Sequence, residues 1–492
     1  MTRSASMNLT TPSLFRVAAL RAALLKARAL RATAALAALI ALLWPALAGA
    51  VLPIEHWTTR AGARVYFVRA ASIPMVDLSI SFDAGDRYDP VDRSGLASLT
   101  TAMLAKGVPG ADEAEIAERF ASVGAQRGGS VGDDRAVVTL RSLASEAELA
   151  SALATLERTL AAPAFPAEVL AREKERVIQA LREAQTKPET LAHREFGRLL
   201  YPQHPYGAYA TPESVSSIRR EDLQRFHRTH FAAPRAVVAM IGALSRERAE
   251  ALAEQLTANL PPGGDAPRLP AVTFPERPVE RRIPHPASQS HILIGAPGIA
   301  WGDPDQFALT VGNYILGGGG FVSRLYDEVR EKRGLAYSVY SYFTPSLQPG
   351  PFTIGLQTQR GQTDLALQVV RETLARFLAD GPTEDEVAAA KANLIGGFAL
   401  RIDSNVKILG YLSTIGFYGL PLDYLDRWTE RIAQVDARQI REAFARHLNG
   451  AVLATVVVGA TADESAPAQA SRTLSGVVEG SAGAAARGAA AR

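Results

Sequence analysis

The chain contains 492 residues, of which 47% are apolar, and its formal net charge is +3. A chain of this length can bury a large core and is predicted to form more than one domain. The first 50 residues hold six basic residues and no acidic one, so the remainder has 47 basic and 50 acidic residues and lacks the balance of a nucleic-acid-binding protein. The absence of cysteine excludes disulfides, cysteine-ligated zinc, cysteine nucleophiles and iron–sulfur clusters.

Residues 1–50 have the pattern of a secretory signal peptide. A basic region precedes an apolar run that ends in small residues, which predicts cleavage after Ala48 or Ala50. An uncleaved anchor in the inner membrane and a mitochondrial transit peptide are the alternatives. Pro45 and the marginal length of the apolar run favour cleavage. We therefore expect an exported protein of a Gram-negative periplasm, with no membrane span after cleavage.

Hydrophobic periodicity predicts alternating strands and helices along the rest of the chain. In the first half, strands are expected at 64–70, 76–84 and 136–143, and helices at 92–106, 146–160 and 166–184. In the second half, a strand is expected at 291–294, helices at 305–316 and 321–332, and a strand pair at 337–342 and 351–357.

The second half repeats the first. Leu223, His230 and Gly242 correspond to Ile440, His447 and Gly459, and all three pairs share one offset of 217. An α+β fold with two similar domains is therefore expected, at 51–265 and 283–465. Residues 266–282 are the predicted linker, which the Pro/Gly-rich stretch Leu260–Pro270 indicates. Residues 466–492 are predicted to be a disordered tail because they are rich in Ala, Gly and Ser.

The segment Gly95–Gly107 reads Gly-Leu-Ala-Ser-Leu-Thr-Thr-Ala-Met-Leu-Ala-Lys-Gly. It resembles the first helix of the inverted-motif zinc peptidases, the family of pitrilysin, insulin-degrading enzyme and the mitochondrial processing peptidase. There the helix carries His-x-x-Glu-His, whose histidines share one helical face and bind zinc while the Glu deprotonates a bound water.

By this resemblance, Ser98 and Ala102 replace the histidines and Thr101 replaces the catalytic base. A third ligand, a Glu on a later helix, aligns with Leu181, unless the register slips to Glu173 or Glu183. Because Ser, Thr, Ala and Leu offer neither imidazole nor carboxylate, we expect no zinc or other cofactor on this chain.

Other candidate sites in the sequence are weaker. His227 and His230 have a spacing that could bind a metal, but they are expected to be surface and helix-end residues. The segment His204–Gly207 is expected to form a structural turn. Ser98 has no Gly-x-Ser-x-Gly context, so a serine nucleophile is not expected there.

The segment Val329–Tyr337 reads Val-Arg-Glu-Lys-Arg-Gly-Leu-Ala-Tyr and resembles the C-terminal half-site of the same family. The resemblance implies that Arg330 holds substrate carbonyls and that Tyr337 donates a hydrogen bond to the oxyanion. From the residues alone, a helix-ending Arg and a strand Tyr are equally compatible with purely structural roles. Four glycines precede the segment, and a structural turn and a substrate-contacting loop are about equally expected there: Gly317, Gly318, Gly319 and Gly320.

The resemblance implies two sandwich domains of the processing-peptidase type that close as a clamshell. It also implies a zinc-free subunit that binds peptide and supplies Arg330 and Tyr337 in trans to a zinc-bearing partner of the same family. A non-enzymatic homologue, similar to the core subunits of respiratory complex III, is the main alternative, and an enzyme with unrecognised metal ligands is a third.

Overall fold

A computed structural model describes residues 53–265, 267–448 and 452–459. The predicted leader over 1–50 and the predicted tail over 466–492 lie outside these residues. Among the described residues, no helix combines the length and the apolar character needed to cross a bilayer.

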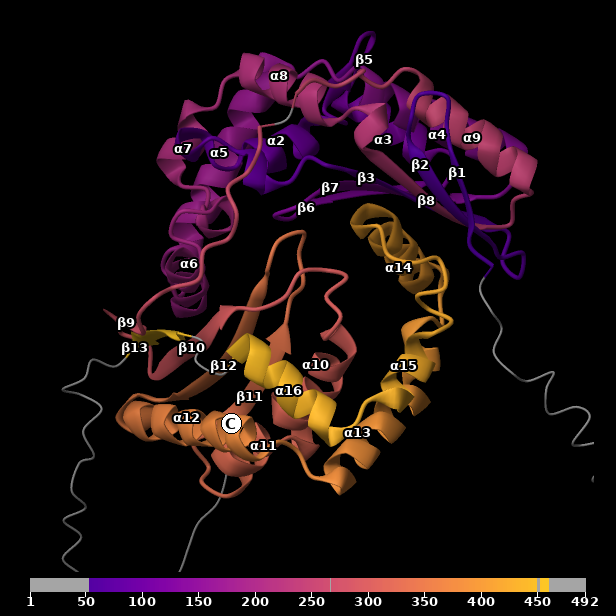
Figure 1. Ribbon diagram of the computed structural model, residues 1–492. Coiled ribbons are helices and arrows are strands. Elements are labelled where there is room, and N and C mark those ends of the chain that lie inside the picture. The colour runs from indigo at the N-terminus through magenta and orange to yellow at the C-terminus, as the bar shows by residue number, and fades with distance from the viewer. Residues whose placement is uncertain (1–52, 266, 449–451, 460–492) are drawn as a thin grey trace, which may run out of the picture.

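The first half is built on a six-stranded sheet with the order β1-β2-β8-β3-β7-β6 (Figure 1). Strands β2 and β8 run parallel and the other neighbours are antiparallel. The strands are β1 (Glu55–Thr58), β2 (Arg64–Arg69), β3 (Met75–Phe82), β6 (Gln126–Val131), β7 (Ala136–Leu143) and β8 (Ala236–Gly242). A separate two-stranded ribbon consists of β4 (Gly107–Val108) and β5 (Ala111–Asp112).

Helices of the first half other than α6 pack on one face of this sheet around Phe67, Ile80 and Phe82, all fully buried. The helices of this half are α2 (Leu96–Met103), α3 (Glu113–Ala121), α4 (Glu146–Ala161), α5 (Ala167–Ala184), α6 (Pro188–Leu200), α7 (Pro212–Ser217), α8 (Arg220–His230) and α9 (Arg246–Ala258).

Helix α2 is shorter than the helix predicted over 92–106. It begins at Leu96 because Gly95 adopts a left-handed conformation with φ 103°. The carboxylate of Asp89 caps this end by accepting hydrogen bonds from the backbone N–H groups of Gly95 and Ala97, at 2.7 and 2.9 Å. The capping group therefore comes from the preceding loop.

The second half has a five-stranded sheet with the order β11-β12-β10-β13-β9. Its strands are β9 (Val279–Pro284), β10 (Gln289–Pro297), β11 (Ala336–Phe343), β12 (Pro351–Gln359) and β13 (Ala454–Gly459). Its helices are α10 (Gln306–Asn313), α11 (Arg324–Tyr326), α12 (Thr363–Asp380), α13 (Glu384–Gly396), α14 (Asn405–Tyr418), α15 (Trp428–Gln434) and α16 (Ala437–Leu448).

Two helices predicted here are interrupted. Instead of continuous helices at 305–316 and 321–332, α10 and α11 each run into a π-helical turn, at Tyr314–Gly318 and Asp327–Glu331. Strand β9 begins at Val279, so the domain boundary predicted at 283 falls inside a strand.

Apart from β1, which has no counterpart in the second sheet, the two sheets have the same strand order when one is reversed, which agrees with the repeat in the sequence. Strands β9 and β13 form the parallel pair that β2 and β8 form in the first half. Helices α8 and α16, at Arg220–His230 and Ala437–Leu448, follow the offset of 217.

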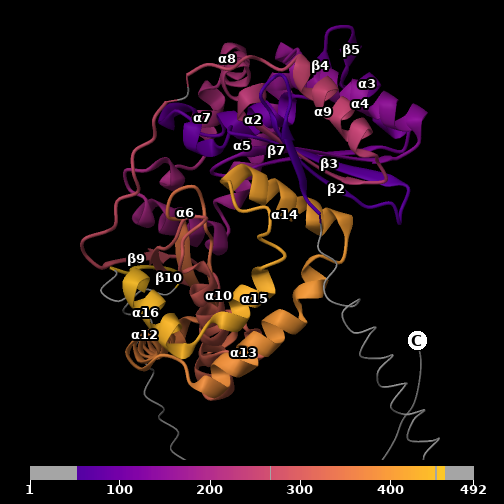
Figure 2. The same ribbon diagram turned by 45° about the vertical axis from the view of Figure 1, so that its right-hand side comes forward.

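Each half covers the open sheet face of the other. Helix α14 of the second half packs on β2, β3 and β8, and α6 of the first half packs on β10 and β13 (Figures 1 and 2). Two apolar clusters join the halves at these contacts, one around Leu412 and Val237 and the other around Phe196 and Val456. Neither sheet would be buried on both faces without the other half.

Candidate functional site

The structure brings three of the degenerate zinc positions together. Ser98 and Ala102 on α2 and Leu181 on α5 line one cavity of about 550 Å³. The positions share this cavity because residues four apart lie on one face of α2, while α5 packs against that helix. Thr101 lies outside it: its side chain is buried, and its hydroxyl donates to the carbonyl of Ala97 at 2.9 Å.

The alternative acids of α5 do not replace the missing ligand. Glu173 is held in ion pairs with Lys106 and Arg176, at 3.2 and 2.9 Å, and Glu183 pairs with Lys187 at 2.8 Å. Neither acid lines the cavity.

The cavity has two carboxylates that the sequence analysis missed, Asp86 and Asp133. The hydroxyl of Ser98 donates to Asp86 at 3.3 Å. Burial raises the pKa of Asp86 to about 6, against the opposing effect of that hydrogen bond. With no imidazole on the cavity wall and no donor atom on the side chains of Ala102 and Leu181, this donor set does not fit the family's zinc ion.

Restoring the three ligands should restore metal binding, because the positions already face one cavity. We expect the variant combining Ser98→His, Ala102→His and Leu181→Glu to retain about one zinc ion per chain after exhaustive dialysis. Elemental analysis would measure this, with the unchanged chain expected to stay metal-free. The matched control carries the same two histidines with Leu181→Gln. Glutamine has nearly the volume of glutamate but no charge, so this control should bind zinc much more weakly. Equal zinc contents in the two variants would contradict the placement of Leu181.

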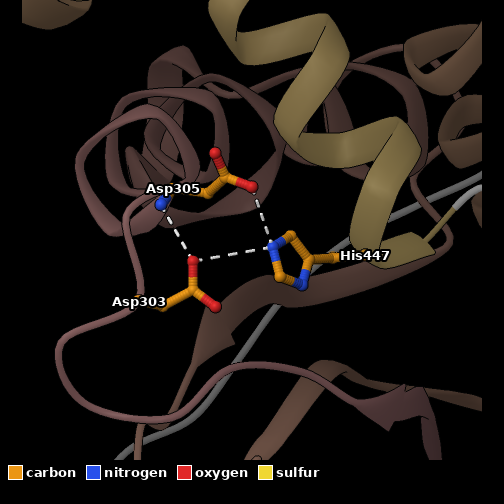
Figure 3. Close-up of side chains that lie close together, drawn as sticks. All are labelled: Asp303, Asp305 and His447. Atoms are coloured by element: carbon orange, nitrogen blue, oxygen red, sulfur yellow. Dashed lines mark hydrogen bonds and ion pairs between the residues drawn. The ribbon is translucent and has the colours of Figure 1, made fainter.

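A different group of metal-type ligands lies at the start of α10 (Figure 3). Among the described residues, Asp303, Asp305 and His447 form the one cluster of three with closely spaced ligand atoms. His447 Nε2 lies 3.0 Å from Asp305 Oδ2 and 3.7 Å from Asp303 Oδ1. Arg446 already donates to both carboxylate oxygens of Asp305, at 2.8 and 2.6 Å, and lowers the pKa of that carboxyl. The cluster therefore fastens α16 to the start of α10.

The other histidines of the sequence analysis have structural partners. His227 and His230 are buried rather than exposed, which corrects the expectation of surface residues. They face different partners, since His227 Nε2 lies 2.7 Å from the carbonyl of Leu160 and His230 Nδ1 lies 3.2 Å from that of Asp83. His204 accepts from the N–H of Tyr206 in a short turn.

Arg330 and Tyr337 lie together on the surface of the second half. The guanidinium of Arg330 stands 4.8 Å from the ring centroids of both Tyr337 and Tyr326, and 5.7 Å from that of Phe321. The side chain of Tyr337 is 82% exposed. Within the described residues, Arg330 has no ion pair, so ring contacts hold its charge at the surface.

The backbone around these residues explains their exposure. Gly334 has φ 61° and donates to the carbonyl of Arg330, which ends the helical turn. The register between β11 and β12 then slips between Ala336 and Val339, so Tyr337 lies in a β-bulge. Strand β11 is at the edge of its sheet in the described part of the chain.

Three of the four glycines are needed for close packing. A Cβ on Gly317 would lie 2.4 Å from Ser341 Oγ, and one on Gly318 or Gly319 would lie 2.6 Å from atoms of Asn313 or Tyr314. Gly320, with φ 59° and open space, leads to Phe321, whose side chain is 77% exposed. The first three therefore pack too closely to carry a side chain, and the contact of this glycine segment with substrate stays a prediction.

Known proteins share this architecture. The family described as "Insulinase (Peptidase family M16)" matches residues 64–208, and "Peptidase M16 inactive domain" matches residues 217–394. The solved peptidase M16 inactive domain of Pseudomonas fluorescens is 39% identical, with a TM-score of 0.80 over 83% of this chain and 98% of that one. The chain belongs to the M16 peptidase family. It lacks that family's catalytic motif, because Ser98, Thr101 and Ala102 stand in its place.

More distant relatives carry the name of zinc proteases. An uncharacterized zinc protease of Bacillus subtilis is 26% identical over 71% of this chain and 85% of its own length. One of Streptomyces coelicolor is 25% identical over 84% of this chain and 91% of its own length. A protease of Helicobacter pylori, 17% identical with a TM-score of 0.75 over 83% of this chain and 100% of that one, shares the fold.

The match to the M16 inactive domain begins before the first structural domain ends. It starts at residue 217, whereas β8, at Ala236–Gly242, lies between β2 and β3 in the first sheet. The residues matched to the inactive domain therefore include β8, which belongs to the first sheet, so the start of this match does not coincide with the boundary between the two structural domains.

Proposed function

We propose that this M16 protein is the zinc-free subunit of an exported heterodimeric metallopeptidase. It binds peptide and supplies Arg330 and Tyr337 to the active site of a zinc-bearing partner. The observation that carries the proposal is a half-site. Tyr337 is exposed and contacts Arg330, which has no ion pair within the described residues, while the cavity at Ser98 lacks the two histidines and the glutamate of the family's zinc site. Export is supported only by the leader pattern of residues 1–50.

The edge strand offers a way to bind an extended peptide. Strand β11 pairs with β12 on one side, and among the described residues its other side has no partner strand. Main-chain groups on such an edge can pair with a peptide backbone without regard to its side chains. A peptide held there would pass Tyr337, which is 82% exposed at this edge.

In the complex, the zinc ion of the partner would activate water and polarise the scissile carbonyl. Tyr337 would donate its phenolic hydrogen to the oxygen of that carbonyl as negative charge develops on it. Arg330, held by three aromatic rings, would bind neighbouring peptide carbonyls through its N–H groups.

The proposal predicts that activity requires both subunits. The purified chain and a zinc-bearing M16 protein from the same organism should each be nearly inactive on a fluorogenic unstructured peptide, and their mixture should cleave it. A chelator should abolish this cleavage. Cleavage by the lone chain that persists in chelator, or a mixture no more active than the zinc-bearing protein alone, would overturn the proposal.

A further inference from the structure

A second pocket lies directly beside Tyr337. It measures about 360 Å³ and lies between the start of α6 and the edge of the second sheet. Glu189 and His193 line it from α6, His291 from β10, and Tyr337 from β11. Glu189 and His193 are four residues apart and therefore share one face of the helix.

The internal repeat provides a comparison for this pocket. In the first sheet, Ile241 pairs with Asp77, which pairs with Arg141; in the second, Val458 pairs with His291, which pairs with Gln357. The equivalent residues lining the cleft under α14 include Asp77, Arg141, Val406 and Leu409. By the offset of 217, Val406 and Leu409 correspond to Glu189 and Ala192 on α6.

The two clefts differ in how their polar groups are satisfied. In the first half, Arg141 donates to both oxygens of Asp77, at 2.6 and 3.1 Å, and the facing residues of α14 are aliphatic. In the second half, the side chains of Glu189, His193 and His291 make no hydrogen bond or ion pair with any described residue. The fold alone thus does not require an acid and two imidazoles at these positions.

The lining indicates the kind of group that would bind. The carboxylate of Glu189 and one nitrogen of each neutral imidazole can accept hydrogen bonds, while Ala192, Leu293 and Leu356 provide an apolar wall. A lysine or arginine side chain combines an aliphatic stem with a cationic, hydrogen-donating head. An acidic side chain would instead meet the carboxylate of Glu189 without a described cation on the pocket wall.

We propose that this pocket, defined by Glu189, His193, His291 and Tyr337, binds a basic side chain of the peptide substrate next to the bond that Tyr337 faces. The statement that the ligand is a substrate side chain rests on the function proposed above. Glu189 is then a specificity-determining residue supplied by the first half of the chain to a site on the second half.

The test uses this chain alone, so that it does not depend on catalysis. Two fluorescein-labelled peptides of alternating threonine and serine would differ only at the centre, where one has lysine and the other norleucine, an uncharged residue with a similar stem. Fluorescence polarisation should show about tenfold tighter binding of the lysine peptide, which corresponds to about 1.4 kcal/mol. The variant Glu189→Gln should remove this preference.

The chain offers a matched control in Glu213→Gln. Both glutamates follow a proline at the start of a helix, in α6 and α7, so both variants lose the same favourable charge near a helix N-terminus. Glu213 is absent from the pocket lining, and its variant should keep the lysine preference. Equal binding of the two peptides, binding of neither, or a lysine preference that survives Glu189→Gln would overturn the pocket assignment. None of these results would change the effect of Tyr337 on turnover, and that effect tests the proposed function separately.

Discussion

Replacing Tyr337 by phenylalanine, in the complex with a zinc-bearing partner, should lower kcat by about 10²–10³-fold. This factor corresponds to the loss of about 2.7–4 kcal/mol, the usual effect of removing one oxyanion donor. The ring would keep its place beside Arg330, since the 4.8 Å contact involves the ring and not the hydroxyl. KM should change little, because the hydroxyl acts mainly on charge that develops in the transition state. Steady-state kinetics on a fluorogenic peptide would measure both constants.

Tyr342→Phe is the matched control for this variant. Tyr342 lies on the same strand, is also exposed, and stacks on Tyr340 at 5.8 Å. Its hydroxyl has no proposed role, so kcat should stay unchanged. If Tyr337→Phe leaves kcat of the complex unchanged, Tyr337 is a structural residue and the protein acts by binding alone.

The sequence predicted which helical positions line one cavity, but not the loop residues that complete its wall. The helical spacing of Ser98 and Ala102, and the register that aligned Leu181, placed all three on one cavity because helix geometry is local and regular. Asp86 and Asp133 were not predicted to line this cavity, because they come from a short 3₁₀ turn and from the loop between β6 and β7. Loop residues carry no periodic signal that would predict what they face.

The sequence also did not predict that α6 and α14 each pack on the sheet of the other half. The apolar faces of these helices predict burial, but periodicity does not identify the sheet that covers them. For the same reason, His227 and His230 were expected at the surface. Both are buried, and they contact the carbonyls of Leu160 in α4 and of Asp83 after β3, which are distant in sequence. The pocket around Glu189 exists only because α6 crosses to the other half, so that no motif could indicate it.

The interface between the two halves contains a buried carboxylate that accepts four hydrogen bonds. Asp134 is 4% exposed and lies in the first half. Its Oδ1 accepts from Arg87 Nη1 at 2.8 Å and from the hydroxyl of Tyr206 at 2.6 Å. Its Oδ2 accepts from the backbone N–H of Leu347 at 2.9 Å and from the hydroxyl of Tyr418 at 3.1 Å, both in the second half.

Asp134→Ala should therefore destabilise the protein by about 3–5 kcal/mol, because it leaves Arg87 with one fewer partner and removes the acceptor of the buried phenol of Tyr206 and the half-buried phenol of Tyr418. Urea denaturation followed by circular dichroism would measure this loss. Asp133→Ala is the control: the neighbouring side chain has no hydrogen bond within the described residues, so its loss should cost less than about 1 kcal/mol. Asp134→Asn, which keeps an acceptor but loses the charge, should fall between them. If Asp134→Ala and Asp133→Ala unfold at the same urea concentration, the four hydrogen bonds do not hold the halves together, and the apolar contacts of α6 and α14 suffice.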